Sequence, residues 1–237
     1  MDSLRGKIIV ALDVTDKAEL NSLLASLKDH ASFVKVGMEL FYAHGASILE
    51  TIKNNNFKIF LDLKLHDIPS TVGKAIKNIF DLDIQMTNVH AAGGLNMMIQ
   101  AKKNCPAHSL LIAVTQLTST SEKVLREELG IDKKMPDIVV QYAMNAQKAG
   151  LNGVVASPLE VPAIKQACGK NFLTVTPGIR LPEDESQDQK RITTPWSAFK
   201  NGSDYIVMGR SITGDKNPGQ KFEEILQRTK DALQNNM

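Results

Sequence analysis

One stretch of the chain, Asp62-Leu63-Lys64-Leu65-His66-Asp67, places a lysine between two carboxylates. Asp62 and Lys64 are two residues apart, so their side chains share a face if the stretch is a β-strand. Asp67 comes shortly before Pro69, which can begin a helix, so we expect Asp67 at the rim of a site where the chain turns. A lysine held between carboxylates keeps its proton, because nearby negative charges favour the ammonium form. The array therefore predicts a proton donor rather than a Schiff-base nucleophile.

Length and composition limit the classes of protein to which the chain can belong. Its 237 residues suit a single (β/α)8 barrel domain over residues 1–237, since such barrels use about 250 residues. A net charge of +2 with mixed signs, and few aromatic residues, argue against binding to nucleic acid or to a membrane surface. The two cysteines form no Cys-x-x-Cys pair, and the sequence has neither an apolar leader nor a membrane-spanning run. These features predict a cytoplasmic protein.

Short apolar runs rich in β-branched residues recur along the chain, and segments with helical periodicity separate most of them. The runs are 7–14, 33–37, 58–65, 86–91, 110–117, 153–157, 172–179 and 203–209, and helical segments include 17–27, 45–53, 71–80 and 138–149. Eight strands alternating with helices favour an α/β fold, the closed (β/α)8 TIM barrel, with parallel strands covered on both faces. The rival is an open doubly wound sheet, but no Gly-x-Gly-x-x-Gly motif follows the first run.

The barrel architecture also predicts where functional residues gather, because active sites of such barrels lie at the C-terminal ends of the strands. Polar residues occur in or just after each run: Asp13, Lys35, Asp62 with Lys64, His90, Thr115 with Thr118, Ser157, Thr176, and Gly209 with Arg210. Taken by itself, the lysine array could also be a surface ion pair on a strand, which is common and nearly neutral in energy. The convergence of polar residues from all eight runs favours a catalytic site at one mouth.

Together these residues resemble the orotidine 5′-phosphate decarboxylase family. The resemblance is carried, in the family's order, by Ala11-Leu12-Asp13, Lys35-Val36-Gly37, the run from Asp62 to Thr71, Leu117-Thr118, Pro177-Gly178-Ile179-Arg180 and Gly209-Arg210. Sugar-phosphate decarboxylases and aldolases of the same suprafamily share the Asp-x-Lys-x-x-Asp pattern. Ile68-Pro69-x-Thr71 and Lys35 narrow the resemblance to the orotidylate branch.

The resemblance implies an activity, the decarboxylation of orotidine 5′-monophosphate to uridine 5′-monophosphate in pyrimidine biosynthesis, with no cofactor and no metal. Loss of CO2 from C6 leaves an electron pair on a vinylic carbon, which preorganised charge must stabilise. The resemblance makes Lys64 the proton donor to C6 and places Asp62 near the substrate carboxylate. Lys35 and Asp67 complete an alternating Lys35-Asp62-Lys64-Asp67 network. Asp62 and Asp67 alone would suit Mg²⁺, but the interleaved lysines oppose a divalent cation.

The resemblance also assigns substrate contacts and a partner. Asp67, Ile68 and Thr71 reach into the site of a second subunit in the family, which implies a homodimer with composite sites. The other implied contacts are Asp13 and Lys35 at the ribose, Thr118 and Ser157 at the pyrimidine, Arg180, Gln189, Gly209 and Arg210 at the phosphate, and Pro177. The polar stretch 181–188 is predicted to be a lid, although it lacks the glycines usual in bacterial relatives.

Two other functions fit parts of the pattern. A Mg²⁺-dependent 3-keto-gulonate 6-phosphate decarboxylase, or a related aldolase, would lose activity with a chelator, and Lys35 argues against it. A non-catalytic nucleotide-binding barrel would use the charges only to organise a pocket, and substrate turnover separates it from an enzyme. We expect His90 to pack and hydrogen-bond below the ligand rather than to act in catalysis.

Overall fold

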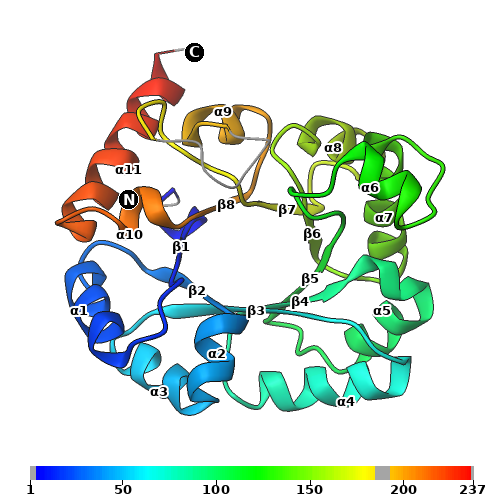
Figure 1. Cartoon of the computed structure of the whole chain (residues 1–237), viewed down its shortest axis with the longest axis horizontal. Helices are drawn as coiled ribbons and strands as arrows, with labels where there is room; N and C mark the ends of the chain where they lie inside the picture. Colours follow the sequence, from blue (N-terminus) through cyan, green and yellow to red (C-terminus); the bar gives the residue numbers. More distant parts are fainter. Residues whose placement is uncertain (1–3, 185–192, 236–237) are drawn as a thin grey trace.

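The chain folds into a closed barrel of eight parallel strands, in the order β1 to β8, with β8 pairing back onto β1. The computed structural model describes residues 4–184 and 193–235. Figure 1 shows the ring of strands with the helices outside it. The strands are β1 (Ile8–Ala11), β2 (Phe33–Gly37), β3 (Lys58–Leu65), β4 (Met86–His90), β5 (Leu110–Val114), β6 (Gly153–Val155), β7 (Leu173–Thr176) and β8 (Tyr205–Met208). The predicted (β/α)8 barrel is confirmed.

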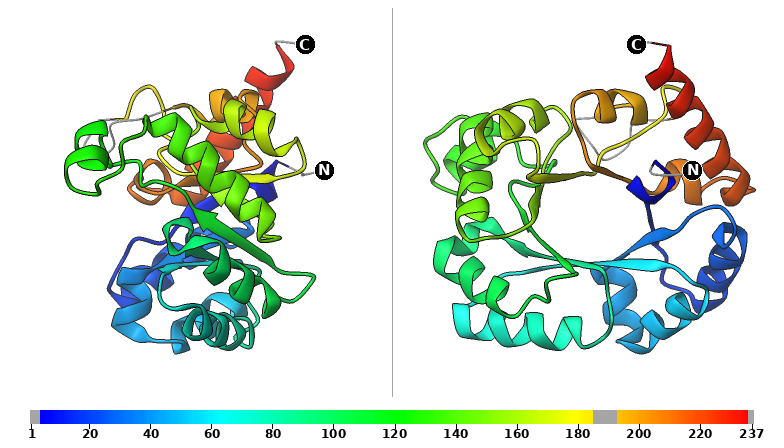
Figure 2. Two further views of the ribbon diagram at one scale, coloured as in Figure 1. Left: turned by 90° about the vertical axis from the view of Figure 1, so that its right-hand side faces the viewer. Right: turned by 180° about the vertical axis from the view of Figure 1, so that it is seen from behind.

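Helices connect successive strands and cover the outside of the barrel, as the views in Figure 2 also show. They are η1 (Arg5–Lys7), α1 (Lys17–Leu27), α2 (Met38–His44), α3 (Ser47–Asn54), α4 (Pro69–Phe80), η2 (Ala91–Gly93), α5 (Gly94–Lys103), α6 (Glu122–Glu127), α7 (Met135–Lys148), α8 (Val161–Cys168), α9 (Pro195–Lys200), α10 (Arg210–Thr213) and α11 (Pro218–Gln234). The four helical segments predicted from periodicity correspond to α1, α3, α4 and α7. Within the described ranges, no helix combines the length and the apolar character needed to span a membrane.

Local sequence signals explain where several helices begin. The carboxylate of Asp16 accepts hydrogen bonds from the backbone N–H groups of Ala18 and Glu19, which caps the start of α1. Pro69 occupies the first turn of α4, where its missing N–H costs nothing. The α4 helix therefore starts directly after the predicted charge array and fixes the direction in which the chain leaves β3.

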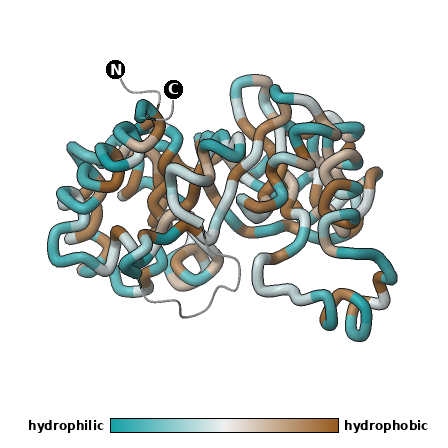
Figure 3. Tube along the Cα trace, turned by 90° about the horizontal axis from the view of Figure 1, so that it is seen from above, coloured by the Kyte–Doolittle hydropathy of each residue, from teal (hydrophilic) through white to brown (hydrophobic). Residues whose placement is uncertain are grey.

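The apolar residues form two layers on either side of the strands. The layer between strands and helices contains Ile8 and Val10 of β1, whereas their neighbour Ile9 belongs to the cluster inside the barrel. That interior cluster consists of Ile9, Ala11, Phe33, Phe60, Met86, Ile112, Val175 and Val207. Figure 3 shows hydrophobic and hydrophilic residues alternating along the outer helices, as expected for helices that cover a barrel with one face. The barrel interior is a packed core, and the site must lie above it.

Several predicted strands end earlier than their apolar runs. Residues 12–14, 115–117 and 177–179 lie beyond the last residues of β1, β5 and β7. Pro177 has no N–H to donate to a ladder, which gives one physical reason for the end of β7. Leu12 and Thr115 each still donate one backbone hydrogen bond to the neighbouring strand, to Lys35 and Val155, and the three segments supply residues to the mouth of the barrel.

Candidate active site

Four charged side chains form a chain of alternating sign at the C-terminal ends of β1, β2 and β3. The Nζ atom of Lys35 lies 3.1 Å from Oδ1 of Asp13 and 3.7 Å from Oδ2 of Asp62. The Nζ atom of Lys64 donates a hydrogen bond of 2.8 Å to Oδ1 of Asp62. Lys35 and Asp62 therefore each have two neighbours of opposite charge.

Asp62 is the centre of this array and is only 9% exposed. Burial by itself disfavours the charged carboxylate. The positive charges of Lys35 and Lys64, together with the hydrogen bonds from Lys64 and Asn88, outweigh that effect, so the pKa of Asp62 is lowered from its ordinary value. Asp62 is consequently an anion over the whole neutral range, and it can hold a cation beside a reacting group.

The backbone at Lys64 departs from a regular strand. Lys64 has a φ of 52°, in the left-handed region, where a residue other than glycine bears a cost of about 1–3 kcal/mol. The pairing of β3 with β4 also shifts between Leu61 and Leu65, which marks a bulge. Asp62 and Lys64 do meet, as predicted, but the bulge rather than regular alternation determines how Lys64 is aimed.

Asn88, on β4, contacts both members of this pair, and the sequence reasoning missed it. Its side chain is fully buried, with Oδ1 accepting from the backbone N–H of Lys64 at 2.8 Å and Nδ2 donating to Asp62 at 2.7 Å. A signal was available in the sequence, because an amide in the middle of a buried strand requires hydrogen-bonding partners.

Two adjoining cavities lie at the mouth and share Lys35, Pro177 and Val207. The first, of about 220 Å³, contains Asp62 and Lys64, and its other lining residues are Phe60, Val114, Gln116, Leu117, Thr118, Ser119, Val155 and Ala156. The second, of about 210 Å³, is lined in addition by Ala11, Asp13, Gly178, Ile179, Arg180, Gly209 and Arg210. One cavity is therefore mainly apolar beside the charge array, and the other brings two arginines together.

Gly209 brings the backbone close to the charged part of the second cavity. A Cβ atom at this position would lie 3.4 Å from Oδ2 of Asp13 and 3.6 Å from Cβ of Ala11. The glycine thus leaves room between Asp13 and the start of α10, where Arg210 follows.

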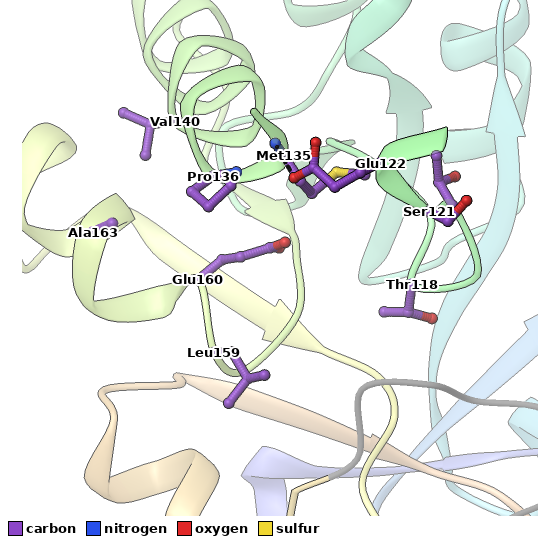
Figure 4. Close-up of a pocket in the computed structure, with 10 residues that line it drawn as sticks. Thr118, Ser121, Glu122, Met135, Pro136, Val140, Leu159, Glu160 and Ala163 are labelled. Carbon is purple, nitrogen blue, oxygen red and sulfur yellow. Dashed lines mark hydrogen bonds between the residues drawn. The ribbon is translucent and has the colours of Figure 1, made fainter. Parts of the chain in front are cut away.

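A third cavity, of about 420 Å³, opens beside the first and shares Thr118 with it. Figure 4 shows Met135 and Pro136 on one side of this cavity and Leu159 on the opposite side. The carboxylate of Glu160 accepts a hydrogen bond from the backbone N–H of Ser157 at 2.9 Å, so it supports the turn after β6.

Some predicted site residues do not line these cavities within one chain. Ser157 is fully buried, and its Oγ accepts from the backbone N–H of Leu159 at 3.4 Å. Asp67 is exposed and accepts from the N–H of Ile68 at 2.6 Å, and it forms no ion pair with any described residue. Ile68 is 64% exposed, and Thr71 is exposed in the first turn of α4. Gln189 lies outside the described residues.

His90, at the end of β4, has a structural contact. Its Nδ1 accepts a hydrogen bond from the backbone N–H of Ala92 at 3.3 Å, and its ring stacks on that of His66 with centroids 5.8 Å apart. Burial, the charge of His66 and the charge of Lys64 lower the pKa of His90. These contacts agree with the expectation that His90 packs and hydrogen-bonds near the site. In the described ranges, no group of three or more His, Cys, Asp or Glu side chains is arranged to hold a metal ion.

Comparisons with known proteins agree with this geometry. Residues 6–225 match the model of the family described as "Orotidine 5'-phosphate decarboxylase / HUMPS family". A protein of Bacillus cytotoxicus named orotidine 5′-phosphate decarboxylase is 48% identical over 93% of this chain and 96% of its own length. A relative of the same name from Bacillus mycoides shows the same identity and coverage.

Solved structures show the same relationship. The crystal structure of orotidine 5′-phosphate decarboxylase from Lactobacillus acidophilus is 42% identical, with a TM-score of 0.83 over 94% of this chain and 98% of that one. The structure of the enzyme of that name from Pyrococcus horikoshii, 24% identical with a TM-score of 0.75 over 94% of this chain and 99% of that one, shows the fold. The chain therefore belongs to the orotidine 5′-phosphate decarboxylase / HUMPS family.

Proposed function

We propose that the chain is a carboxy-lyase that converts orotidine 5′-monophosphate to uridine 5′-monophosphate and CO2 in pyrimidine biosynthesis, with Lys64 as the proton donor. The observation that carries this proposal is the Lys64 ammonium, held 2.8 Å from Asp62 in the wall of an apolar cavity. The names of the relatives support the choice of substrate.

The two adjoining cavities match the two ends of a nucleoside monophosphate. Phe60, Val155 and Ala156 give the first cavity apolar walls suited to a planar base, and Thr118 adds a hydroxyl. In the second cavity, Arg180 and Arg210 supply guanidinium groups, which bind phosphate in a fixed geometry.

Asp13 and Lys35 lie where the ribose would connect the two ends. Lys35 lines both cavities, and Asp13 lies 3.1 Å from its ammonium. We assign both side chains to the ribose hydroxyls and Pro177 to the wall around the ligand. Gly209 lies at the phosphate beside Arg210, and Gln189 is assigned to the phosphate as the family resemblance implies.

The proposed chemistry needs no group beyond these residues. The bond between C6 and the carboxylate carbon breaks, CO2 leaves, and the electron pair stays on C6. A proton then moves from Nζ of Lys64 to C6, and the resulting amine regains a proton from solvent. Asp62 holds the ammonium in place and lies close to the departing carboxylate, whose charge is lost as CO2 forms.

We further propose a homodimer in which Asp67, Ile68 and Thr71 complete the partner's site. Within the described part of the chain, Lys64 forms an ion pair only with Asp62, and Asp67 forms none. The Ile68 side chain next to Asp67 is 64% exposed in one chain and would be buried against the second copy in this arrangement. The partner's Asp67 would then give Lys64 its second carboxylate and complete the Lys35-Asp62-Lys64-Asp67 network.

We place the enzyme in the cytoplasm, because Cys105 and Cys168 are both free thiols, as is usual in a reducing compartment.

The decisive experiment follows orotidylate absorbance with purified protein in the presence of a chelator. We expect turnover by the wild type and a loss of at least about 10³-fold in Lys64→Ala, because a positioned general acid contributes about 10²–10⁴-fold and Lys64 also stabilises charge. Lys123→Ala, which removes a lysine 77% exposed on α6, is the matched control and should retain full activity.

The other possible results of this assay distinguish the proposed function from its alternatives. Equal turnover by wild type and Lys64→Ala would exclude Lys64 as the proton donor. Loss of wild-type activity on chelation would favour the Mg²⁺-dependent decarboxylases of the suprafamily. Binding without turnover would favour a nucleotide-binding barrel.

A further inference from the structure

We propose that Asn88 is a positioning residue for the reaction, because its amide fixes the backbone of Lys64 and the carboxylate of Asp62 at the same time. The effect on turnover rests on the proposed function, whereas the effect on the charge array does not.

The first observation is the place of Asn88 opposite the bulge. The ladder pairs Leu61 with Thr87, and the next pair joins Leu65 with Val89. Three residues of β3, 62–64, therefore lie opposite a single residue of β4, Asn88. A bulge removes regular ladder partners, so the backbone groups within it need other partners.

The side chain of Asn88 supplies these partners. Its Oδ1 accepts from the backbone N–H of Lys64, the residue with the left-handed φ of 52°. On the neighbouring residue, Thr87, Oγ1 donates to the carbonyl oxygen of Leu61 at 2.8 Å. Two consecutive side chains of β4 thus bind the backbone of β3 where the strand departs from regular geometry.

The NH2 group of the Asn88 amide positions the carboxylate of Asp62. Oδ1 of Asp62 accepts from Nδ2 of Asn88 at 2.7 Å and from Nζ of Lys64 at 2.8 Å, while its Oδ2 faces Lys35 at 3.7 Å. Turning the amide around would place its oxygen against the carboxylate and its NH2 against the N–H of Lys64. Only one orientation satisfies both contacts, so the amide ties the two catalytic groups into one rigid unit.

Asparagine is suited to this position because it donates and accepts without carrying charge. The charged groups that face Asp62 are Lys35 on β2 and Lys64 on β3, with Asp13 beyond Lys35 and His90 near Lys64. A carboxylate in place of Asn88 would still accept from the N–H of Lys64, but it would repel Asp62 and lose the donor. Asn88→Asp therefore removes the donor and keeps the acceptor, whereas Asn88→Ala removes both.

The test compares Asn88→Ala and Asn88→Asp with Asn152→Ala. Asn152 is the matched control, because its Oδ1 also accepts from a strand N–H, that of Leu111, at 3.0 Å, but at the N-terminal end of the barrel. We expect kcat to fall at least about 100-fold in both Asn88 variants, as for catalytic groups displaced by about 1 Å, with KM changed less than about threefold. Asn152→Ala should keep the wild-type kcat although its melting temperature falls.

A second readout does not depend on turnover. The titration of the Asp62 carboxyl, followed by its ¹³C NMR signal, should move to higher pH in both Asn88 variants and stay in place in Asn152→Ala, because only the former lose the donor. Wild-type kcat and an unmoved Asp62 titration in Asn88→Ala would overturn the inference. If that variant does not fold, the same result in Asn88→Asp would overturn it. An inactive wild type with a shifted Asp62 titration would instead refute the proposed function alone.

Discussion

Asp62 and Lys35, carried by neighbouring strands, face each other across 3.7 Å at the mouth of the barrel, while Lys64 binds the other oxygen of Asp62 at 2.8 Å. One buried anion thus holds two cations that would otherwise repel each other. The stability of the fold and the geometry of the site are linked through this carboxylate.

This link predicts a pH dependence of stability. Because the pKa of Asp62 is lower in the folded chain than the ordinary value of 3.8, its ionisation stabilises the fold above that value. We expect the free energy of unfolding of the wild type to exceed that of Asp62→Asn at neutral pH, with a difference that shrinks as the pH falls below 3.8. Urea denaturation at several pH values measures it. Asp81→Asn, which removes an exposed carboxylate paired with Lys77, is the control, and a pH-independent difference would contradict the prediction.

Arg210 is predicted to bind the substrate phosphate. Removing one charge-assisted hydrogen bond costs about 1.5–3 kcal/mol, so Arg210→Ala should lower kcat/KM for the nucleotide by about 10–150-fold. The nucleoside orotidine lacks the phosphate, so its slow turnover should be the same in both proteins. Arg126→Ala, on the exposed face of α6, should change neither value. Equal losses for nucleotide and nucleoside would show that Arg210 does not act on the phosphate.

The composite site can be tested by mixing two inactive variants. In a dimer of Lys64→Ala with Asp67→Ala, one site has both residues intact and the other has neither. Random exchange of subunits should therefore restore about a quarter of the wild-type activity, given an isologous two-fold dimer. Activity after mixing and the mass from sedimentation together check this. No recovery in a mixed dimer would place Asp67 outside the partner's site.

Gly153 is predicted to be essential for closing the barrel. A Cβ atom at this position would overlap with the carbonyl oxygen and Cβ of Leu173, its partner on β7. Since β6 is paired on both sides and cannot move away, we expect Gly153→Ala to destabilise the fold by about 3 kcal/mol or more. Gly6→Ala, where the nearest atom is 4.0 Å away, should have little effect on the melting temperature. Equal melting temperatures would contradict the packing argument.

The barrel could be predicted from the sequence because the same pattern, an apolar run followed by a helical segment, recurs along the chain. β2 and β3 coincide with their apolar runs, and the other runs contain the observed strands. Asp13, Lys35, Asp62 and Lys64 could be grouped because parallel strands bring their C-terminal ends to one edge.

The parts that could not be predicted depend on contacts between distant segments. The bulge at Lys64 follows from the pairing of β3 with β4, which the alternation of residues along β3 does not reveal. The role of Asn88 could not be predicted either, because its side chain binds the backbone of that bulge. Ser157 follows a strand end in the sequence, which suggested a place at the mouth. In the structure its side chain is buried, with Oγ bound to the N–H of Leu159 and its own N–H bound to Glu160. In the homodimer that we propose, Asp67 reaches Lys64 only from a second copy of the chain, and the order of residues within one chain carries no information on that distance.

Phe60 and Val207 belong both to the packed interior of the barrel and to the lining of the first cavity. The charges at the mouth therefore stand on apolar side chains, which screen them less than water would. Coulomb interactions at a given separation grow as the effective dielectric constant falls. Packing deep in the barrel thus amplifies the electric field at the mouth, so a substitution in the interior that admits water would weaken the field without touching a charged residue.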